Sequence, residues 1–432
     1  MGASRFGRLA MAAALFLPSV LAPAVLAPPA ASAQNPESVP QRTPAPAPAP
    51  ALDAARLRAT LNATRAAGMY GLYSTVRAGD QKWDGASGVA DPRTRRPVAP
   101  GMRHRIGAVT ATFTATALMQ QVEQGRLRLD DPIAAHLPDA VSGERGHQIT
   151  VRMLLNHTSG IADQLTVAFP SLAERSTRSL DERRRWRHPV RTLISEAVNA
   201  PQAAPPGSGP AHAGTNDLIA GLLLEKVSGM RAEDYITRNV IRRAGLRHTA
   251  FPTGPEIEGP HSGMYESLHR RARPPRDYST FDMSYAWTAG ALVSTTDDLT
   301  RFYRALFTGG LVTAASLAEM RRTVPAQDDP AVRYGLGLVS MDLPCGTFWG
   351  HDGTVFGAGT RTLTSADGTR QIAVGWNLTK YQRLDAAGRP IAHPIDNALR
   401  AHIEQGLCSG PERLTADAPA QPLPLEYLTP ES

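Results

Sequence analysis

The stretch that decides the fold is RIGAVTATFTATALMQQVEQGRLRLDDP, residues 105–132. From about Ala108 to Gln124 it consists almost wholly of apolar residues, Thr and Gln, and its first charged residue is Glu123. Gly125 follows at the position where glycine commonly ends a helix. This pattern predicts a long apolar helix that is buried in the interior of the domain.

Four further helices are indicated by capping residues and by apolar side chains at helical spacing. They are expected from Asp53 with Leu57 and Leu61 inward, over Leu218–Val227 up to Gly229, from a capping box of Thr295 and Asp298 with Leu299, Phe302 and Leu306 inward, and over Ile395–Gln405. Residues 165–209 are polar and rich in Pro and Gly, and are expected to be irregular or partly helical.

Strands are predicted near both ends of the chain by short apolar and β-branched runs. They are expected at Met69–Val76, Trp83–Val89, Tyr334–Ser340, Phe348–His351, Thr360–Thr364 and Gln371–Trp376. Asp367-Gly368 lies where a hairpin turn would join the last two strands. Strands at both ends with helices between them indicate an α+β domain whose sheet is completed by the two termini.

The ends of the chain are expected to lie outside the folded domain. Residues 1–33 have a basic start, an apolar stretch from Leu9 to Leu26 and the small-residue site Ala31-Ser32-Ala33, which together predict a secretory signal peptide rather than a membrane anchor. Residues 34–51 contain PAPAPAPA and are expected to be a linker. The domain is expected at 52–411 and a loose tail at 412–432, so the mature protein is predicted to be secreted and extracellular.

The chain has two cysteines, Cys345 and Cys408. In an exported protein such a pair predicts a disulfide, and two buried free thiols are the alternative. The formal charge is +7, and the densest basic run holds Arg183, Arg184, Arg185 and Arg187 around Trp186. We interpret this run as a solvated loop or helix face and expect no nucleic-acid partner.

The run at residues 105–132 resembles the nucleophile helix of class C β-lactamases and related D-alanyl-D-alanine carboxypeptidases. Similar segments follow in the family's order: ITVRMLLNHTSGI (149–161), GLLLEKVSG (221–229), SYAWTAGALVSTTDDL (284–299), YGLGL (334–338) and GHDGTVFGAG (350–359). The resemblance spans about residues 55–410, and the cysteine placement fits the secreted carboxypeptidase branch. It implies an antiparallel sheet formed by the N- and C-terminal parts, flanked by helices, with a mainly helical subdomain.

The family's chemistry is acyl transfer to a serine, and the resemblance implies which positions would carry it. A Ser-x-x-Lys pair, a Tyr-x-Asn motif and a His-x-Gly or Lys-x-Gly strand form its catalytic site. In this chain the serine and lysine positions are Ala108 and Ala111, and the second motif reads His212-Ala213-Gly214. The third motif remains as His351-Asp352-Gly353. A methyl group neither attacks a carbonyl nor accepts a proton, so the covalent chemistry is expected to be lost.

A displaced Ser-x-x-Lys pair is excluded by the sequence. The three lysines Lys82, Lys226 and Lys380 are preceded at the third position by Gly79, Leu223 and Asn377. Thr110, Thr112 and Thr114 point away from the face of the former nucleophile on a helix, so none is expected to replace it.

A binding cleft is implied to remain. The resemblance places His351, Asp352, Gly353 and Thr354 at its wall, with Tyr285 either lining the cleft or belonging to the core. The N–H groups of Ala108 and of the strand after His351 would still form an oxyanion hole. The family's carboxylate-holding arginines would follow YGLGL, where Val339, Ser340 and Met341 stand instead.

No metal and no cofactor are expected. His212, His351 and Asp352 could suggest a metal site, but His212 and His351 are about 140 residues apart without a clear third ligand, and we interpret them as residues of a vestigial cleft. His157 of HTSG is interpreted as a hydrogen-bonded core residue.

Three functions therefore stay open. The first is a pseudoenzyme that binds a peptidoglycan stem peptide, a β-lactam or a protein partner without reacting. The second is an amide hydrolase, transacylase or esterase with a non-standard nucleophile or with a water activated by His212 or His351. The third is a structural or regulatory protein with a relic cleft.

Overall fold

The computed structural model describes residues 51–326 and 331–408. The expected signal peptide at 1–33, nearly all of the expected linker and the expected tail at 412–432 lie outside these residues. Within the described ranges, no helix combines the length and the apolar character needed to cross a membrane.

The described strands are β1 (Gly71–Ala78), β2 (Gln81–Asp91), β3 (Arg96–Pro97), β4 (His104–Arg105), β5 (Tyr265–Glu266), β6 (Arg276–Asp277), β7 (Val293–Ser294), β8 (Val324–Pro325), β9 (Val332–Tyr334), β10 (Val339–Leu343), β11 (Gly346–Val355), β12 (Ala358–Ser365), β13 (Arg370–Trp376) and β14 (Leu378–Thr379). The described helices are α1 (Ala54–Ala66), α2 (Val109–Glu123), η1 (Ile133–Ala135), α3 (Glu144–Gln148), α4 (Val151–Leu155), α5 (Leu165–Ala168), η2 (Pro170–Leu172), α6 (Arg178–Arg183), α7 (Val190–Asn199), α8 (Gly214–Ser228), α9 (Ala232–Ile236), η3 (Thr237–Ile241), α10 (Trp287–Gly290), α11 (Thr296–Phe307), α12 (Ala314–Met320) and α13 (Pro394–Leu407).

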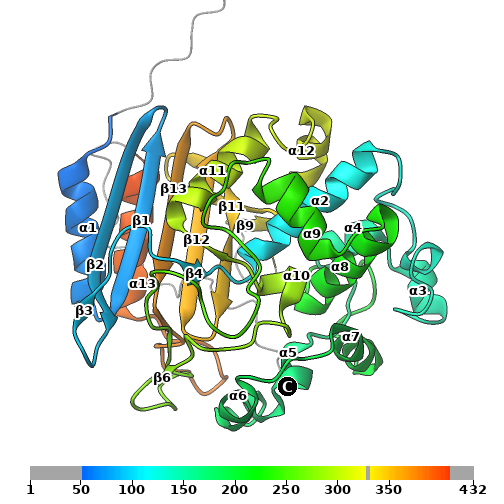
Figure 1. Ribbon diagram of the computed structural model, residues 1–432, viewed down its shortest axis with the longest axis horizontal. Helices are drawn as coiled ribbons and strands as arrows, with labels where there is room; N and C mark the ends of the chain where they lie inside the picture. Colours follow the sequence, from blue (N-terminus) through cyan, green and yellow to red (C-terminus); the bar gives the residue numbers. More distant parts are fainter. Residues whose placement is uncertain (1–50, 327–330, 409–432) are drawn as a thin grey trace, which may run out of the picture. The chain divides into compact units, whose positions relative to one another are not determined.

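The main sheet joins the two ends of the described chain. Its strands are ordered β3-β2-β1-β13-β12-β11-β10-β9-β8, and every neighbouring pair is antiparallel (Figure 1). The junction is β1 against β13, where Tyr73 pairs with Gly375 and Val76 pairs with Ile372. The expected α+β fold with a sheet completed by both termini is confirmed.

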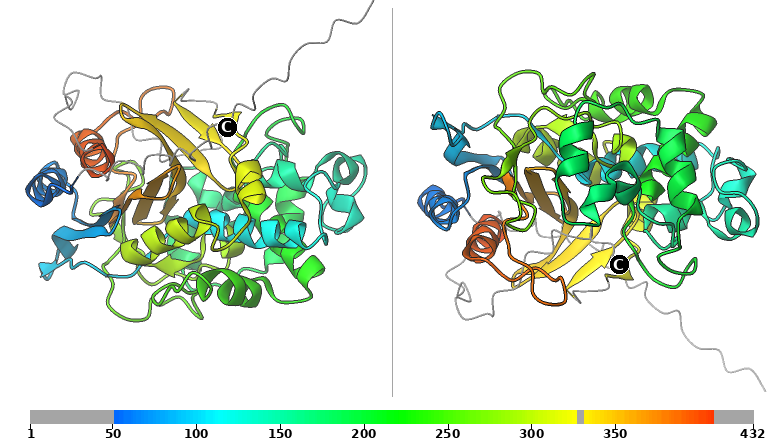
Figure 2. Two further views of the ribbon diagram at one scale, coloured as in Figure 1. Left: turned by 90° about the horizontal axis from the view of Figure 1, so that it is seen from above. Right: turned by 90° about the horizontal axis from the view of Figure 1, so that it is seen from below.

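Helices cover both faces of this sheet (Figure 2). On one face, α1 and α13 pack against each other and against β1, β2 and β13, with the buried side chains of Leu57, Leu61, Ile395, Leu399 and Ile403. On the other face lie α2 and α11, whose residues share a core cluster with α8 and α9. As Asp53 was expected to do, its carboxylate caps α1 by accepting a hydrogen bond from the N–H of Arg56 at 2.9 Å.

Helix α2 is the long apolar helix expected within residues 105–132, and it is buried from Val109 to Gln121. It packs against α8, α10, α9 and β11, so it links the sheet to the mainly helical part of the domain. Figure 1 shows α3, α4, α7, α8 and α9 gathered on the side of the sheet away from α1. The long apolar helix and the helical subdomain are both as the sequence indicated.

The prediction of one continuous strand over Tyr334–Ser340 is wrong. The segment is split into β9 and β10, and the turn between them places Gly337 at a φ of +61°. A Cβ on Gly337 would lie 2.5 Å from the Cβ of Ala115, because this turn rests directly on α2. The sequence pattern of residues 334–340 does not indicate this turn, because the turn is caused by the packing of helix α2 beneath it.

The expected capping box at α11 is half present. The hydroxyl of Thr295 accepts a hydrogen bond from the N–H of Asp298 at 3.2 Å. The carboxylate of Asp298 does not return to Thr295 but accepts hydrogen bonds from the N–H of His248 and the hydroxyl of Thr249. Asp298 therefore fixes a neighbouring loop to the helix instead of completing the cap.

The basic run begins at the last residue of α6 and continues into the segment before α7, and two of its arginines form local hydrogen bonds. Arg183 donates to the carbonyl of Ala168, and Arg184 donates to carbonyls of Asp277 and Thr280. Trp186 is 54% exposed. The run is thus a folded surface segment.

The expected disulfide is present. It joins Cys345, in the turn between β10 and β11, to Cys408, directly after α13, with the two Cα atoms 5.5 Å apart. The bond holds the C-terminal helix to the sheet and closes a loop with a sequence separation of 63.

Candidate functional site

The site is centred where the N-terminus of α2 meets β11. A Cβ on Gly353 would lie 2.7 Å from the backbone N of Ala108, and a Cβ on Gly107 would lie 2.8 Å from the N of Thr354. Gly107 also has a φ of +53°. Because neither glycine has a side chain, the two backbones approach each other closely and bring the N–H groups of Ala108 and Thr354 to one place.

The N–H of Ala108 is available to a ligand. Ala108 precedes the first turn of α2, where helical N–H groups have no partner within the helix. Among the described residues its N–H donates no hydrogen bond. Ala108 and Thr354 both line the cleft, so their backbone N–H groups are the pair that the expected oxyanion hole would use.

A cleft of about 570 Å³, including space open to solvent, lies beside these groups. Its lining contains five of the residues expected at the site, namely Ala108, His212, Gly214, Tyr285 and Thr354. The remaining lining residues are Asp163, Gln164, Leu165, Glu266, Ala286, Ala289, Gly290, Val355, Phe356 and Lys380. Residues from α2, α8, β11 and the loop before α10 thus meet at one cavity.

His351, Asp352 and Gly353 are close to the cleft but do not line it. The Nε2 of His351 lies 2.6 Å from the hydroxyl of Tyr334, and the ring is 3% exposed. Burial lowers the pKa of His351, so its ring is neutral at pH 7. Asp352 instead forms an ion pair with Arg361 of β12 at 3.1 Å. Gly353 contributes the close backbone contact described above.

The positions of the family's serine and lysine hold only methyl groups. Ala108 is partly exposed in the cleft, whereas Ala111 is fully buried and lies outside the lining. No serine and no cysteine is among the residues that line the cleft. The hydroxyl groups in the lining belong to Thr354 and Tyr285, and burial raises the pKa of the Tyr285 phenol.

The threonines of α2 are engaged elsewhere. Thr112 donates to the carbonyl of Gly337 at 2.7 Å, and Thr114 donates to the carbonyl of Thr288 at 2.8 Å. The hydroxyl of Thr110 accepts a hydrogen bond from the N–H of Leu292. All three are fully buried, so none of them is placed to attack a ligand in the cleft.

The wall that carries the second motif is built around Asp163. Its carboxylate accepts hydrogen bonds from the N–H of Gly214 at 2.7 Å and from the N–H of Leu165 at 2.6 Å. Asp163 and Gln164 line the cleft beside Gly214, where the family's asparagine would stand. A Cβ on Gly214 would lie 2.7 Å from the Gln164 amide nitrogen, so Gln164 occupies space next to the missing side chain.

His212 occupies the position of the family's tyrosine. Burial, with a smaller contribution from His351, lowers the pKa of His212 to about 4. Its ring centroid lies 4.4 Å from that of His157. A neutral imidazole in this position presents a weak base to the cleft, without the serine that it would have to activate.

His157, His212 and Asp217 have ligand atoms within 4.8 Å of one another, which makes them the candidate metal group among the described residues. The Nδ1 of His157 receives the N–H of Ala213 at 3.3 Å and lies 3.1 Å from the Asn216 amide nitrogen. These contacts assign the His157 proton to Nε2, which faces Asp217 at 3.7 Å. A metal at Nε2 would have to displace that proton, so the hydrogen bonds do not fit a metal site.

Burial also opposes charge in this group. It lowers the pKa of His157 well below the usual range and raises the pKa of Asp217 well above it. Burial thus disfavours the charged form of both side chains across their 3.7 Å contact. The position of His157 agrees with its interpretation as a hydrogen-bonded core residue.

An aromatic cluster forms the floor of the cleft. Tyr285 stacks on Phe356 with centroids 5.8 Å apart and an interplanar angle of 29°. Phe169 and Phe281 surround Tyr285 at centroid distances of 4.9 and 6.0 Å. Tyr285 is 3% exposed, so it both lines the cleft and belongs to the core.

Lys380 is the cationic residue in the cleft lining that the sequence analysis did not assign to the site. It follows β14 with a φ of +48°, and its carbonyl accepts the N–H of His269 at 2.7 Å. The neighbouring Glu266 uses its carboxylate to bind the N–H of Leu268 and the hydroxyl of Thr379. The one feature of the sequence that distinguishes Lys380 is the rarity of lysine. The chain has three lysines and 43 arginines among its 46 basic residues.

The sequence and the fold of this chain are similar to those of known proteins. The Beta-lactamase family matches residues 28–393. Penicillin-binding protein 4 of Amycolatopsis lactamdurans is 27% identical over 283 residues, which cover 62% of this chain and 70% of that protein. A D-stereospecific amidohydrolase from Streptomyces sp. superimposes with a TM-score of 0.72 at 33% identity, over 83% of this chain and 99% of that one.

A second solved structure, the D-amino acid amidase of Ochrobactrum anthropi SV3 complexed with L-phenylalanine amide, has a TM-score of 0.69 at 23% identity, over 81% of this chain and 97% of that one. At this level of identity, the similarity to the amidase shows a shared fold. Since the family match covers most of the chain and a solved relative is aligned along nearly its whole length, the protein belongs to the Beta-lactamase family of serine hydrolase-like proteins.

Proposed function

We propose that this protein is an exported, non-catalytic member of its family that binds an acyl-peptide or β-lactam ligand without forming a covalent bond. The observation that carries the proposal is the combination of a cleft with a backbone donor pair and a nucleophile position occupied by Ala108. Binding groups are retained, whereas the group that would break the acyl bond is a methyl.

The loss of catalysis follows from the residues around the cleft. Serine attack needs a hydroxyl and a base, and positions 108 and 111 supply neither. Removal of a serine-hydrolase nucleophile leaves a residual acceleration of roughly 10³ over water, from the oxyanion hole and binding alone. A water activated by neutral His212 is the competing mechanism, and turnover would reveal it.

The ligand class is supported by the lining and by the relatives. The N–H groups of Ala108 and Thr354 suit a carbonyl oxygen, and the Tyr285–Phe356 floor suits an apolar group. One relative is named a penicillin-binding protein, and another is named a D-stereospecific amidohydrolase. Lys380 offers a cation to a ligand carboxylate, in place of the arginines that are absent after YGLGL.

Export is supported by the disulfide and by the N-terminal sequence. A Cys345–Cys408 bond is typical of oxidising compartments. Detection of a mature N-terminus at Gln34 in culture medium would support export, and retention of the intact chain in the cytoplasm would contradict it.

Titration calorimetry tests the binding proposal. An acyl-D-Ala-D-Ala peptide and its C-terminal amide are titrated into the full chain and into four variants. Ala108→Leu fills the cleft at its centre and should abolish heat, whereas Ala63→Leu on the exposed surface of α1 should not. Lys380→Gln should weaken binding of the peptide acid about tenfold and leave binding of the peptide amide unchanged, because one charge-assisted contact to the carboxylate is lost. Lys226→Gln, at an exposed position of α8, is its control.

Absence of heat with the peptides and with a penicillin would contradict the proposal and would favour a relic cleft. Hydrolysis of the peptide by the wild type, lost in His212→Gln, would instead establish the water mechanism.

A further inference from the structure

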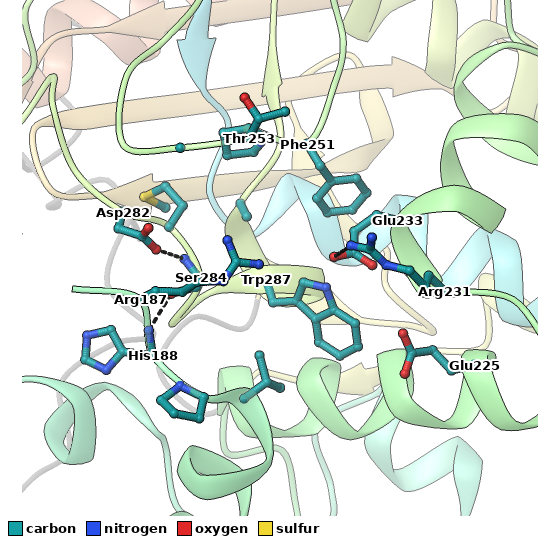
Figure 3. A pocket seen from close by; sticks show the side chains of 16 residues that line it. Arg187, His188, Glu225, Arg231, Glu233, Phe251, Thr253, Asp282, Ser284 and Trp287 are labelled. Carbon is teal, nitrogen blue, oxygen red and sulfur yellow. Dashed lines mark hydrogen bonds and ion pairs between the residues drawn. The ribbon is translucent and has the colours of Figure 1, made fainter. Parts of the chain in front are cut away.

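A second pocket lies on the other side of the segment Met283–Ala291. Tyr285, Ala286, Ala289 and Gly290 of this segment line the cleft, whereas Met283, Ser284, Trp287 and Ala291 line the second pocket (Figure 3). The second pocket measures about 860 Å³, including space open to solvent, which exceeds the cleft. Its lining shares no residue with the cleft. The acyl-transfer chemistry that the family carries out at the position of Ala108 does not involve this pocket.

Two aromatic side chains give the pocket an apolar centre. Figure 3 shows Phe251 and Trp287 facing the cavity from opposite sides. Trp287 opens α10 with a φ of +25°, which is uncommon for a bulky residue. Its ring packs on Gly221 of α8, where a Cβ would come within 2.7 Å of the indole. The fold thus holds a strained backbone in place with the indole at this cavity, a feature that often accompanies binding sites.

Carboxylates stand at one end of the pocket. Glu233 forms an ion pair with Arg231 at 3.1 Å, and one oxygen of Glu225 accepts the N–H of Ala232 at 3.2 Å. Glu225 and Glu233 both line the cavity, so this end carries two carboxylates against the one guanidinium of Arg231. The excess charge there is negative and suits an ammonium group.

Arg187 stands at the other end. It is one of two exposed arginines of the basic run, with Arg185, and among the described residues its guanidinium makes no ion pair or hydrogen bond. Figure 3 shows its side chain directed into the cavity, with Phe251 and Trp287 lying between it and the Arg231–Glu233 pair. The carboxylate of Asp282 also lines this pocket, but it accepts the N–H of Ser284 and forms no ion pair with Arg187 among the described residues. The Arg187 guanidinium can therefore bind a ligand carboxylate through two parallel hydrogen bonds.

The backbone around Arg187 is fixed by short polar contacts. The N–H of His188 donates to the hydroxyl of Ser284 at 2.7 Å, and the N–H of Ser284 donates to Asp282 at 2.9 Å. The N–H of Asp282 in turn donates to the carbonyl of Arg184 at 2.7 Å. The loop that carries Arg187 is therefore tied to the segment that carries Trp287, so the Arg187 end of the pocket is preorganised.

We propose that this pocket binds a short zwitterionic peptide with an aromatic or apolar side chain, such as a dipeptide, whose terminal charges are separated by the peptide backbone. The ligand carboxylate lies at Arg187, its ammonium group lies at Glu225 and Glu233, and its side chain lies between Phe251 and Trp287. This is a second ligand site, independent of the cleft that contains Ala108.

Three probes of one shape separate the contributions of the two charges. Alanyl-phenylalanine carries both, its C-terminal amide carries the ammonium group alone, and its N-acetyl derivative carries the carboxylate alone. Each is titrated into the full chain by calorimetry, with the L,L and the D,D forms of the dipeptide. We expect the free dipeptide to bind at least tenfold more tightly than either singly charged probe.

Variants then locate the site. Arg187→Ala should weaken binding of the free dipeptide and of its N-acetyl derivative about tenfold and leave binding of the dipeptide amide unchanged. Glu233→Gln should weaken binding of the free dipeptide and of its amide and leave binding of the N-acetyl derivative unchanged. Matched controls are Arg185→Ala, which belongs to the same run but not to the lining, and Glu182→Gln on exposed α6. The cleft variant Ala108→Leu should leave binding of the free dipeptide unchanged.

Equal affinities for the three probes, or no binding of any of them, would overturn the proposal. Unchanged binding in Arg187→Ala, or loss of binding in Ala108→Leu, would assign the ligand to another place, the cleft in the second case.

Discussion

The backbone N of Ala108 lies only 2.7 Å from the point where a Cβ on Gly353 would be. The same Cβ would lie 2.1 Å from the carbonyl oxygen of Ile106. Strand β11 therefore meets the N-terminus of α2 through backbone atoms alone, and this contact positions the donor pair of the cleft.

Gly353→Ala should separate β11 from α2. Both contacts are to backbone atoms, which cannot move aside as a flexible side chain can, so we expect a loss of about 1–3 kcal/mol in the free energy of unfolding and a loss of ligand binding in the cleft. Urea denaturation and calorimetry measure the two effects. Gly254→Ala is the control, because its Cβ would meet no atom closer than 3.9 Å. Wild-type binding and stability in Gly353→Ala would show that the contact does not set the cleft.

Removal of the disulfide should lower stability substantially. Closing a loop with a sequence separation of 63 contributes about 4 kcal/mol in the chain-entropy model. We expect the double variant Cys345→Ser/Cys408→Ser to unfold at lower urea concentration by an amount equivalent to that figure. A reducing agent should produce the same shift in the wild type and none in the variant. Equal midpoints for oxidised wild type and variant would contradict a stabilising bond.

Stability should fall below about pH 6.5, partly because of His402. This residue is fully buried in α13, where its Nδ1 lies 2.9 Å from the hydroxyl of Thr60, and burial lowers its pKa to about 3. In the unfolded chain the pKa is about 6.5, so between these values the unfolded state binds a proton that the folded state does not. The contribution is complete above pH 6.5 and declines as the pH falls towards 3.

His402→Gln should therefore reduce the dependence of the free energy of unfolding on pH by up to about 1.4 kcal/mol per pH unit in this window. Urea denaturation at several pH values between 4 and 7 measures the slope. His147→Gln, at an exposed position of α3, should leave it as in the wild type. An unchanged slope in His402→Gln would mean that the ring is protonated in the folded state.

The fold was largely predictable from the sequence because its elements have local causes. Helix α2 is apolar on all sides, Asp53 and Gly229 mark helix ends, and Asp367-Gly368 marks a hairpin with Gly368 at a φ of +75°. The failures have non-local causes. Gly337 turns because α2 lies beneath it, and Asp298 turns away from its cap because His248 and Thr249 offer donors.

The candidate site was predictable where a motif marks it and not elsewhere. Ala108, His212 and Thr354 lie in segments of recognisable pattern, and the cleft contains them. Asp163 and Lys380 reach the same cleft from a loop and from the end of β14, and no spacing relates them to α2. The second pocket depends even more on tertiary structure, since Arg187, Phe251 and Trp287 come from three separate segments.

The central claim is that Ala108 leaves the cleft without a nucleophile, and intact-mass measurement after incubation with a penicillin tests it most directly. The account predicts that the mass of the wild-type protein stays unchanged, while a family member with an intact Ser-x-x-Lys pair gains one penicilloyl group under the same conditions. A gain of that mass by the wild type, mapped to any side chain in the cleft, would contradict it.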